Sequence, residues 1–401
     1  MDLADSGGST IESRDPLDPG RVASPSRERG GDRAGMLAYD LRFATDHFSG
    51  IGTHAFCLLQ ALLELPGPER YAVLWNPALT NTRFDIGPLR RHPRVTWFER
   101  SYAPLSPGGL LGVGRWLKQI RPSVYFSPFY LLPVAPGCPS VLTVHDVWPL
   151  RLPYGLEAWK RGLYRLLLRR ATRARFMITS SEFSRREIGD LVRVDTGRIR
   201  VVRLGVPPAR DAFDARRPAR LPDGPFALVV GVNFPYKNLE TLARAWNHLG
   251  SEAPLRLVAA GREDPRFPRL GSLAGERGIS VLGPVGQSEL EWLYANAVML
   301  LFPTLYEGFG FPMVEAFVHG LPVVASDIPP LRELGNGSAR FVDPRDEAAW
   351  ASAVVELARD EPARRRMREA GLERAGQLTY RATAEATLAV LREAVAEERA
   401  A

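Results

Sequence analysis

The sequence has few cysteines, no long apolar run and no acidic motif of the D-x-D kind. Cys57 and Cys138 stand far apart in 401 residues and lack metal-ligand spacing, which excludes a disulfide framework and a structural zinc site. No stretch approaches the roughly 18 consecutive apolar residues of a membrane span, and the N-terminus lacks the apolar core of a signal peptide. We therefore expect a cytoplasmic protein, either soluble or peripheral at the inner face of the membrane.

The missing D-x-D motif also bears on phosphate ligands. The acidic residues form no other metal-binding cluster in the sequence, so we expect no metal ion and no cofactor. The charge of a bound diphosphate would then fall to basic side chains and backbone amides.

The chain is basic, with 52 Lys plus Arg against 45 Asp plus Glu and a formal net charge of +7. Such a balance suits anionic partners, namely nucleotide phosphates, anionic lipid headgroups or nucleic acid, but charge alone fits a generally basic surface equally well. No nucleic-acid recognition motif accompanies the charge, so we expect no nucleic-acid partner.

Composition changes sharply near residue 36. Residues 1–35 are rich in Gly, Ser, Pro, Asp and Arg and poor in aliphatic side chains, which predicts a disordered N-terminal tail. Met36 opens the first apolar run and is a candidate for the functional start of the protein.

Short apolar runs then alternate with amphipathic segments in two series. This alternation predicts parallel sheets covered by helices on both faces. We expect an α/β protein with two doubly wound, Rossmann-like domains and a cleft between them, in which ligands sit beyond the C-terminal strand ends. The parts are an N-terminal domain at 36–209, a linker at 210–225, a C-terminal domain at 226–378, and a helix at 379–401 that packs back toward the N-terminal domain.

Two places in the first domain follow predicted strands. Gly50 and Gly52 begin a helix, where small residues let a ligand approach the backbone closely, although G-x-G is more often only a turn. His145 and Asp146 directly follow the strand at 140–144. The histidine could contact a sugar hydroxyl or simply cap the strand, and the residues leave both readings open.

Two segments of the second domain lie next to predicted helix starts. Lys237 stands between the strand at 226–230 and the next helix, where an ammonium group suits phosphate, although such a lysine is more often merely exposed. Ser288 and Glu291 fit the S-x-x-E pattern of a capping box and are expected to be structural.

The segment YEGFGFPMVEA, at 306–316, has two glutamates around a run of small and aromatic residues. Glu307 follows a buried strand, and Glu315 is expected in the first turn of the next helix. The free amides of Phe309, Gly310 and Phe311 suit phosphate, and the carboxylates suit hydroxyl groups. A nucleotide sugar has both features. On spacing alone, helix capping and ligand binding are equally good interpretations.

With these residues in view, the chain resembles the retaining, GT-B-fold glycosyltransferases of family four, especially a bacterial branch with many mannosyltransferases. The likeness covers about 36–395, and its most specific element is the E-x7-E pair. It runs through SGIGTH, TVHDVWP, ITSSEFSRREI, VVGVNFPYKNLETL, VLGPVGQSELEWLYANA, LFPTLYEGFGFPMVEAFVHGLPVVASD and LRELGNGSARFVDP.

The resemblance implies roles in binding a nucleotide-sugar donor. Glu315 would bind the ribose, Glu307 would face the transferred sugar, and His145 would contact that sugar near the reacting carbon. Lys237 would bind the diphosphate, helped by the amides of Phe309, Gly310 and Phe311, while Gly50 and Gly52 would approach it from the other domain. Val232 and Tyr236 depart from the arginines that are common in the family.

The resemblance also implies the reaction. We expect transfer of a hexose, with mannose from GDP-mannose as the leading choice, to a glycan or lipid-linked acceptor. A nucleotide-sugar epimerase of similar fold and a catalytically silent sugar-binding subunit remain alternatives.

The segment 159–175 is both leucine-rich and arginine-rich. It fits a basic amphipathic helix on an anionic membrane surface, and it also fits a sheet-packing helix with a solvated basic face. The second interpretation is the commoner one.

Overall fold

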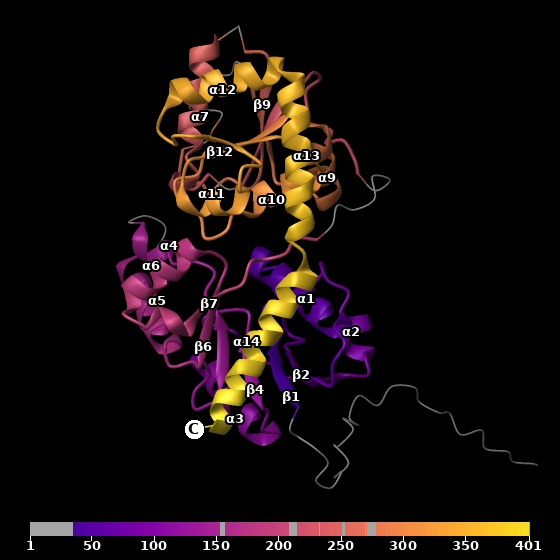
Figure 1. Cartoon of the computed structure of the whole chain (residues 1–401), viewed down its shortest axis with the longest axis vertical. Helices are drawn as coiled ribbons and strands as arrows, with labels where there is room; N and C mark the ends of the chain where they lie inside the picture. The colour runs from indigo at the N-terminus through magenta and orange to yellow at the C-terminus, as the bar shows by residue number, and fades with distance from the viewer. Residues whose placement is uncertain are drawn as a thin grey trace, which may run out of the picture. The chain divides into compact units, whose positions relative to one another are not determined.

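The structure is a computed structural model, and it describes residues 35–152, 157–207, 215–231, 233–250, 253–268, 270 and 278–400, which belong to one compact unit. The predicted tail at 1–35, apart from Gly35, lies outside the described residues, as do part of the linker and Val232. Two sheets, each purely parallel, organise the chain (Figure 1).

The first sheet has seven strands in the order β3-β2-β1-β4-β5-β6-β7. Its strands are β1 (Met36–Asp40), β2 (Arg70–Trp75), β3 (Val95–Glu99), β4 (Val124–Ser127), β5 (Ser140–Thr143), β6 (Phe176–Thr179) and β7 (Ile199–Val201). Its helices are α1 (Ser49–Glu64), α2 (Gly87–Arg91), α3 (Pro107–Ile120), α4 (Trp148–Arg151), α5 (Ala158–Ala171) and α6 (Glu182–Val192).

The second sheet has six strands in the order β10-β9-β8-β11-β12-β13. They are β8 (Phe226–Val230), β9 (Arg256–Ala260), β10 (Ile279–Gly283), β11 (Met299–Phe302), β12 (Val323–Ser326) and β13 (Arg340–Val342). The helices are α7 (Leu239–Leu249), α9 (Gln287–Asn296), α10 (Phe311–Val318), α11 (Pro329–Gly335), α12 (Glu347–Arg359), α13 (Glu361–Gln377) and α14 (Tyr380–Ala400). The predicted fold class is confirmed.

The side chains of the strands belong to hydrophobic cores on both faces of each sheet. In β1, Leu37 and Tyr39 belong to one core and Ala38 to the opposite one; in β8, Leu228 and Val229 are divided in the same way. Successive side chains of a strand point to opposite faces, so burying both faces requires an uninterrupted apolar run. The runs seen in the sequence are therefore those of central parallel strands.

Helix α14 packs on the domain that contains the first sheet, beside α1 and the strands β4 to β6 (Figure 1). Its buried Ala384, Leu388 and Leu391 join the core that contains α1. The chain thus crosses between the two sheets twice, near Gly205 and near Tyr380. The two crossings touch, because the Val206 amide donates to the Leu378 carbonyl at 3.1 Å.

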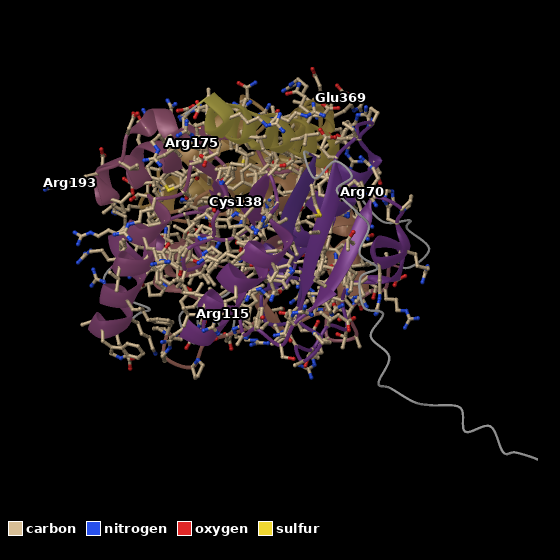
Figure 2. All side chains as sticks on the ribbon, turned by 90° about the horizontal axis from the view of Figure 1, so that it is seen from below. Arg70, Arg115, Cys138, Arg175, Arg193 and Glu369 are labelled. Carbon is tan, nitrogen blue, oxygen red and sulfur yellow. The ribbon has the colours of Figure 1, made fainter. Side chains whose placement is uncertain are left out.

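At the end of the molecule drawn in Figure 2, the labelled arginines lie on different sides rather than in one place. There Arg70, Arg115, Arg175 and Arg193 lie around Cys138. Both cysteines are free and partly buried. Within the described ranges, no helix combines the length and the apolar character needed to cross a bilayer.

Candidate active site

The predicted capping box at the start of α9 is wrong in its position. The N-cap is Gly286, whose amide donates to Oε2 of Glu289 at 2.9 Å, so Ser288 lies inside the helix. The G-x-x-E pattern from Gly286 to Glu289 begins two residues before the S-x-x-E pattern. Its glutamate accepts the hydrogen bond from the N-cap amide. Glu291 instead contacts His319, with 2.6 Å between Oε2 and Nε2.

The loop after β11 packs tightly on both of its sides. A Cβ on Gly308 would lie 2.6 Å from the His145 carbonyl oxygen and 2.7 Å from the Asp146 Cβ. Gly310 has φ of +109° and serves as the N-cap of α10, and a Cβ there would lie 2.6 Å from Leu331. Only glycine fits both positions, which explains why YEGFGFP has two glycines in place of residues with larger side chains.

A cavity of about 420 Å³ opens beside this loop. Its walls come from segments that follow strands of both sheets, which is where parallel sheets bind ligands. The lining residues are Gly50, Ile51, Phe129, Tyr130, His145, Asp146, Trp148, Pro149, Tyr164, Ser180, Leu204, Glu307, Gly308, Phe309, Gly310 and Phe311.

Lys237 and Glu307 form an ion pair, with 2.6 Å between Nζ and Oε1. Their side chains are only 16% and 13% exposed, so this pair is shielded from water. Lys237 closes a short 3-10 turn, Pro235–Lys237, and its ammonium also lies 5.2 Å from the Tyr236 ring centroid. An ammonium has three N–H donors, so Lys237 can hold a phosphate oxygen while it keeps Glu307.

His145 is fixed as a neutral imidazole. Its Nε2 lies 3.0 Å from the Pro128 carbonyl oxygen, which can only accept, so Nε2 carries the proton and Nδ1 is an acceptor. Burial lowers the pKa of His145 to about 4. The buried ring of His54 meets it edge-on, with 5.2 Å between centroids.

Asp146 lies beside the ion pair. Burial, and then the negative charge of Glu307, raises the pKa of Asp146 to about 6, with Lys237 opposing the rise. Its backbone carbonyl accepts the Tyr164 hydroxyl at 3.0 Å. Two acidic side chains, Asp146 and Glu307, therefore line the cavity, and Lys237 pairs with Glu307.

Glu315 is the fifth residue of α10, not a first-turn residue as the sequence predicted. Gly310 takes the N-cap and Pro312 the second helical position, so the helix begins earlier than the spacing implied. Burial raises the pKa of Glu315, and the Tyr294 hydroxyl, which donates to its Oε2 at 2.7 Å, partly lowers it. A favourable interaction with the dipole at the helix start therefore does not explain why a glutamate stands at position 315.

The structure brings most of the predicted residues together. Gly50, His145, Glu307, Phe309, Gly310 and Phe311 line the cavity, and Lys237 joins them through Glu307. Gly52 and Glu315 are not among the lining residues. A Cβ on Gly52 would lie 2.9 Å from the Phe43 carbonyl oxygen, so Gly52 permits a close backbone contact within the first domain.

Sequence reasoning missed an aromatic wall. Phe129, Tyr130, Trp148 and Tyr164 line the cavity from the side of the first sheet. Phe129 and Tyr130 follow β4 directly, so a search of every strand end would have found them. Tyr164 lies on α5, far along the chain, and only the fold brings it there.

Sequence reasoning also missed a set of serines at the start of α6. The Gly308 carbonyl accepts hydroxyls from Ser180, Ser181 and Ser184, at 3.1, 2.9 and 3.3 Å. These serines belong to ITSSEFSRREI, where the pattern alone indicates only a helix cap. Among the described residues, no cluster of three or more His, Cys, Asp or Glu side chains suits a metal ion.

Comparison with known proteins bears on both halves of the chain. A family model described as Glycosyltransferase Family 4 matches residues 48–210, and one described as Glycosyl transferases group 1 matches residues 224–360. Together the two matches take in both sheets and the loop after β11.

Named relatives are about 30% identical to this chain over the residues that align. The O-antigen chain mannosyltransferase B of Escherichia coli is 29% identical over 66% of this chain and 72% of its own length. The O-antigen chain mannosyltransferase RfbU of Salmonella typhimurium is 28% identical over 54% of this chain and 60% of its own. A D-inositol 3-phosphate glycosyltransferase of a Nocardioides species is 30% identical over 57% and 56%.

Solved structures share the fold. The sucrose-phosphate synthase of Thermosynechococcus elongatus superposes with a TM-score of 0.67 at 18% identity, over 90% of this chain and all of that one. A glycosyltransferase of Rickettsia africae gives a TM-score of 0.65 at 15% identity, over 90% and 98%.

Two parallel-sheet domains that share a cavity at their C-terminal strand ends, with both family models matched, define a glycosyltransferase of GT-B architecture. The chain belongs to family four of these enzymes and is similar to its bacterial mannosyltransferase-like branch.

Proposed function

We propose that this protein is a retaining glycosyltransferase that moves a hexose from a nucleotide sugar to a glycan or lipid-linked acceptor in polysaccharide biosynthesis. The observation that carries the proposal is the Lys237–Glu307 ion pair, in which Glu307 lines a cavity shared by both domains. Mannose from GDP-mannose is the leading donor, supported by the similarity to two O-antigen chain mannosyltransferases.

The residues present suit a metal-independent reaction. Lys237 and the amides of Phe309 to Phe311 would stabilise the charge that grows on the departing diphosphate, an electrostatic contribution that is often the largest in catalysis. Glu315 would accept hydrogen bonds from the ribose hydroxyls. The acceptor hydroxyl would attack from the face that the diphosphate leaves, and a phosphate oxygen would take its proton.

Neutral His145 would help to place the donor sugar. Because its Nε2–H is held by Pro128, the imidazole offers Nδ1 as an acceptor for a sugar hydroxyl. Water exclusion by the surrounding aromatic side chains would protect the activated sugar from hydrolysis. We place the reaction in the cytoplasm, which suits the two free cysteines.

A thermal-shift screen of GDP, UDP, ADP and dTDP sugars tests the proposal, because a ligand that binds only the folded state raises the melting temperature. At 100 times its Kd, the matching donor should stabilise the protein by about 2.7 kcal/mol. Lys237→Ala should greatly reduce this shift while the variant stays folded.

Failure of every nucleotide sugar to raise the melting temperature would remove donor binding and the proposal with it. Conversion of the donor by the protein without an acceptor would favour the epimerase alternative. Binding of the donor without turnover on any glycan would favour the silent subunit.

A further inference from the structure

Helix α5, Ala158–Ala171, has an inner face that belongs to the active site. Leu168 and Ala171 are buried in the core of the first sheet, and Tyr164 lines the cavity and donates its hydroxyl to the Asp146 carbonyl. This helix is therefore anchored on one side by packing and by a hydrogen bond at the cavity wall.

The outer face of α5 is apolar where a surface helix is normally polar. Trp159 is 64% exposed, Leu163 47% and Leu166 64%. At about 100° per residue, these three side chains fall within an arc of roughly 60°, and Leu168 lies opposite them. The helix therefore packs on the first sheet through Leu168 and Ala171, as one interpretation of 159–175 expected, but among the described residues Leu163 and Leu166 join no core.

Basic side chains flank this stripe. Arg165, Arg169 and Arg173 are exposed and form no ion pair among the described residues, and Lys160 pairs with Glu157 at 2.9 Å. The helix itself contains no Asp or Glu. Arg170 differs from these, because its guanidinium donates to the carbonyls of Leu132 and Pro133 and is part of the fold.

We propose that the outer face of α5 docks on an anionic lipid bilayer. An apolar stripe with an aromatic residue, bordered by cations on a helix that itself has no acidic side chain, matches the interface of such a bilayer in both polarity and charge. The stripe would enter the boundary between headgroups and acyl chains, and the arginines would contact the phosphates.

This docking identifies the class of acceptor, and this step rests on the proposed transferase activity. One face of α5 meets the bilayer while Tyr164, on the other face, lines the cavity. An acceptor anchored in the bilayer could then reach the transferred sugar without leaving the membrane. The acceptor class we infer is a lipid-linked glycan.

Vesicle cosedimentation with the full chain tests the docking. The protein should pellet with vesicles of phosphatidylcholine mixed with phosphatidylglycerol, should pellet poorly with phosphatidylcholine alone, and should be released by salt. The double variant R165Q/R169Q should lower the partition coefficient about thirtyfold. The double variant W159S/L166S should lower it roughly tenfold or more.

The chain offers matched controls on α13, in the second domain. Leu372 is 46% exposed there, and Arg365 and Arg366 are exposed as well. The variants L372S and R365Q/R366Q should pellet like the wild type, and circular dichroism should find every variant folded.

Wild-type protein that pellets with neither vesicle would overturn the inference, as would α5 variants that pellet like the wild type. A change in molar mass of W159S/L166S by light scattering, with vesicle binding unchanged, would also overturn it and assign the stripe to a second copy of the chain. The thermal-shift screen on the same samples is independent: a lack of nucleotide-sugar binding would remove the proposed function and the acceptor class, and leave the docking to stand.

Discussion

Tyr294 holds one oxygen of the Glu315 carboxylate and leaves the other free for a ligand. The hydroxyl donates to Oε2 at 2.7 Å, while the ring stacks on His319, with centroids 5.3 Å apart. His319 is fixed in turn: burial alone would lower its pKa, but hydrogen bonds to Glu291 and to the Glu315 carbonyl raise it. Tyr294 is therefore a positioning residue for the proposed ribose contact.

Tyr294→Phe removes the hydroxyl and keeps the stacked ring. We expect nucleotide-sugar affinity to fall tenfold or more, since a hydrogen bond to a charged group contributes about 1.5–3 kcal/mol. Loss of the donor also raises the pKa of Glu315 further, so more of this carboxyl is protonated at pH 6 than at pH 8. The loss of affinity, measured by calorimetry, should therefore be larger at pH 6.

Tyr71→Phe is the matched control, because the Tyr71 hydroxyl is buried without a hydrogen-bond partner among the described residues. It should leave the affinity unchanged at both pH values. A Tyr294→Phe affinity equal to the wild type at pH 6 would contradict the positioning role.

At the scale of elements, Gly205 sets how closely the two crossings between the sheets approach each other. A Cβ there would lie 2.3 Å from the Tyr380 amide nitrogen and 2.4 Å from the Thr379 carbonyl carbon. These are backbone atoms, which cannot rotate away as a side chain can. Gly205→Ala should lower the free energy of unfolding by about 1–3 kcal/mol, measured by urea denaturation.

Gly376→Ala is the opposite case. Gly376 lies in α13, and nothing would lie within 4 Å of an added Cβ. This change should stabilise the protein by about 0.5–1 kcal/mol, because alanine favours the helix and restricts the unfolded chain. Equal effects of the two substitutions would contradict the role assigned to Gly205.

Local pattern was sufficient to predict most of the elements. The strand expected at 226–230 is Phe226–Val230, and the strand expected at 140–144 is Ser140–Thr143. Patterns that compete within a few residues were not resolved. At α9 both Gly286 and Ser288 precede a glutamate by three residues, and only backbone geometry selects Gly286.

Contacts distant in sequence were beyond the reach of pattern. The E-x7-E spacing and the resemblance pointed to Glu307, Glu315 and Lys237, but no periodicity could pair Ser180 with Gly308, which lies 128 residues away. The exposed stripe of α5 was equally hidden, because burial of a leucine depends on which elements pack against its helix.

At the scale of the whole molecule, the domain that contains the first sheet holds the loop after β11, which belongs to the other domain. Three serine hydroxyls donate to Gly308, next to Glu307, and Glu333 of α11 accepts the Glu182 amide at 3.0 and 3.2 Å. The carboxylate thus compensates the positive start of α6 from across the interface. These contacts stabilise the arrangement of the domains rather than either core.

The double variant S180A/E333Q should separate the arrangement of the domains from the stability of their cores. It removes one hydroxyl and one negative charge from the interface, at a cost of about 1–2 kcal/mol to the contact. Each domain keeps its own cores, so the melting temperature should change little. The radius of gyration from solution scattering should increase. The value of kcat should fall several-fold, because Glu307 lies next to Gly308 in the same loop.

Ser181 is spared in this variant, since its hydroxyl also caps α6 by accepting the Ser184 amide. Ser181→Ala should therefore lower both the melting temperature and kcat, while S180A/E333Q lowers kcat alone. A fall in melting temperature of S180A/E333Q as large as that of Ser181→Ala, with no change in scattering, would show that the serines stabilise α6 rather than the contact between domains.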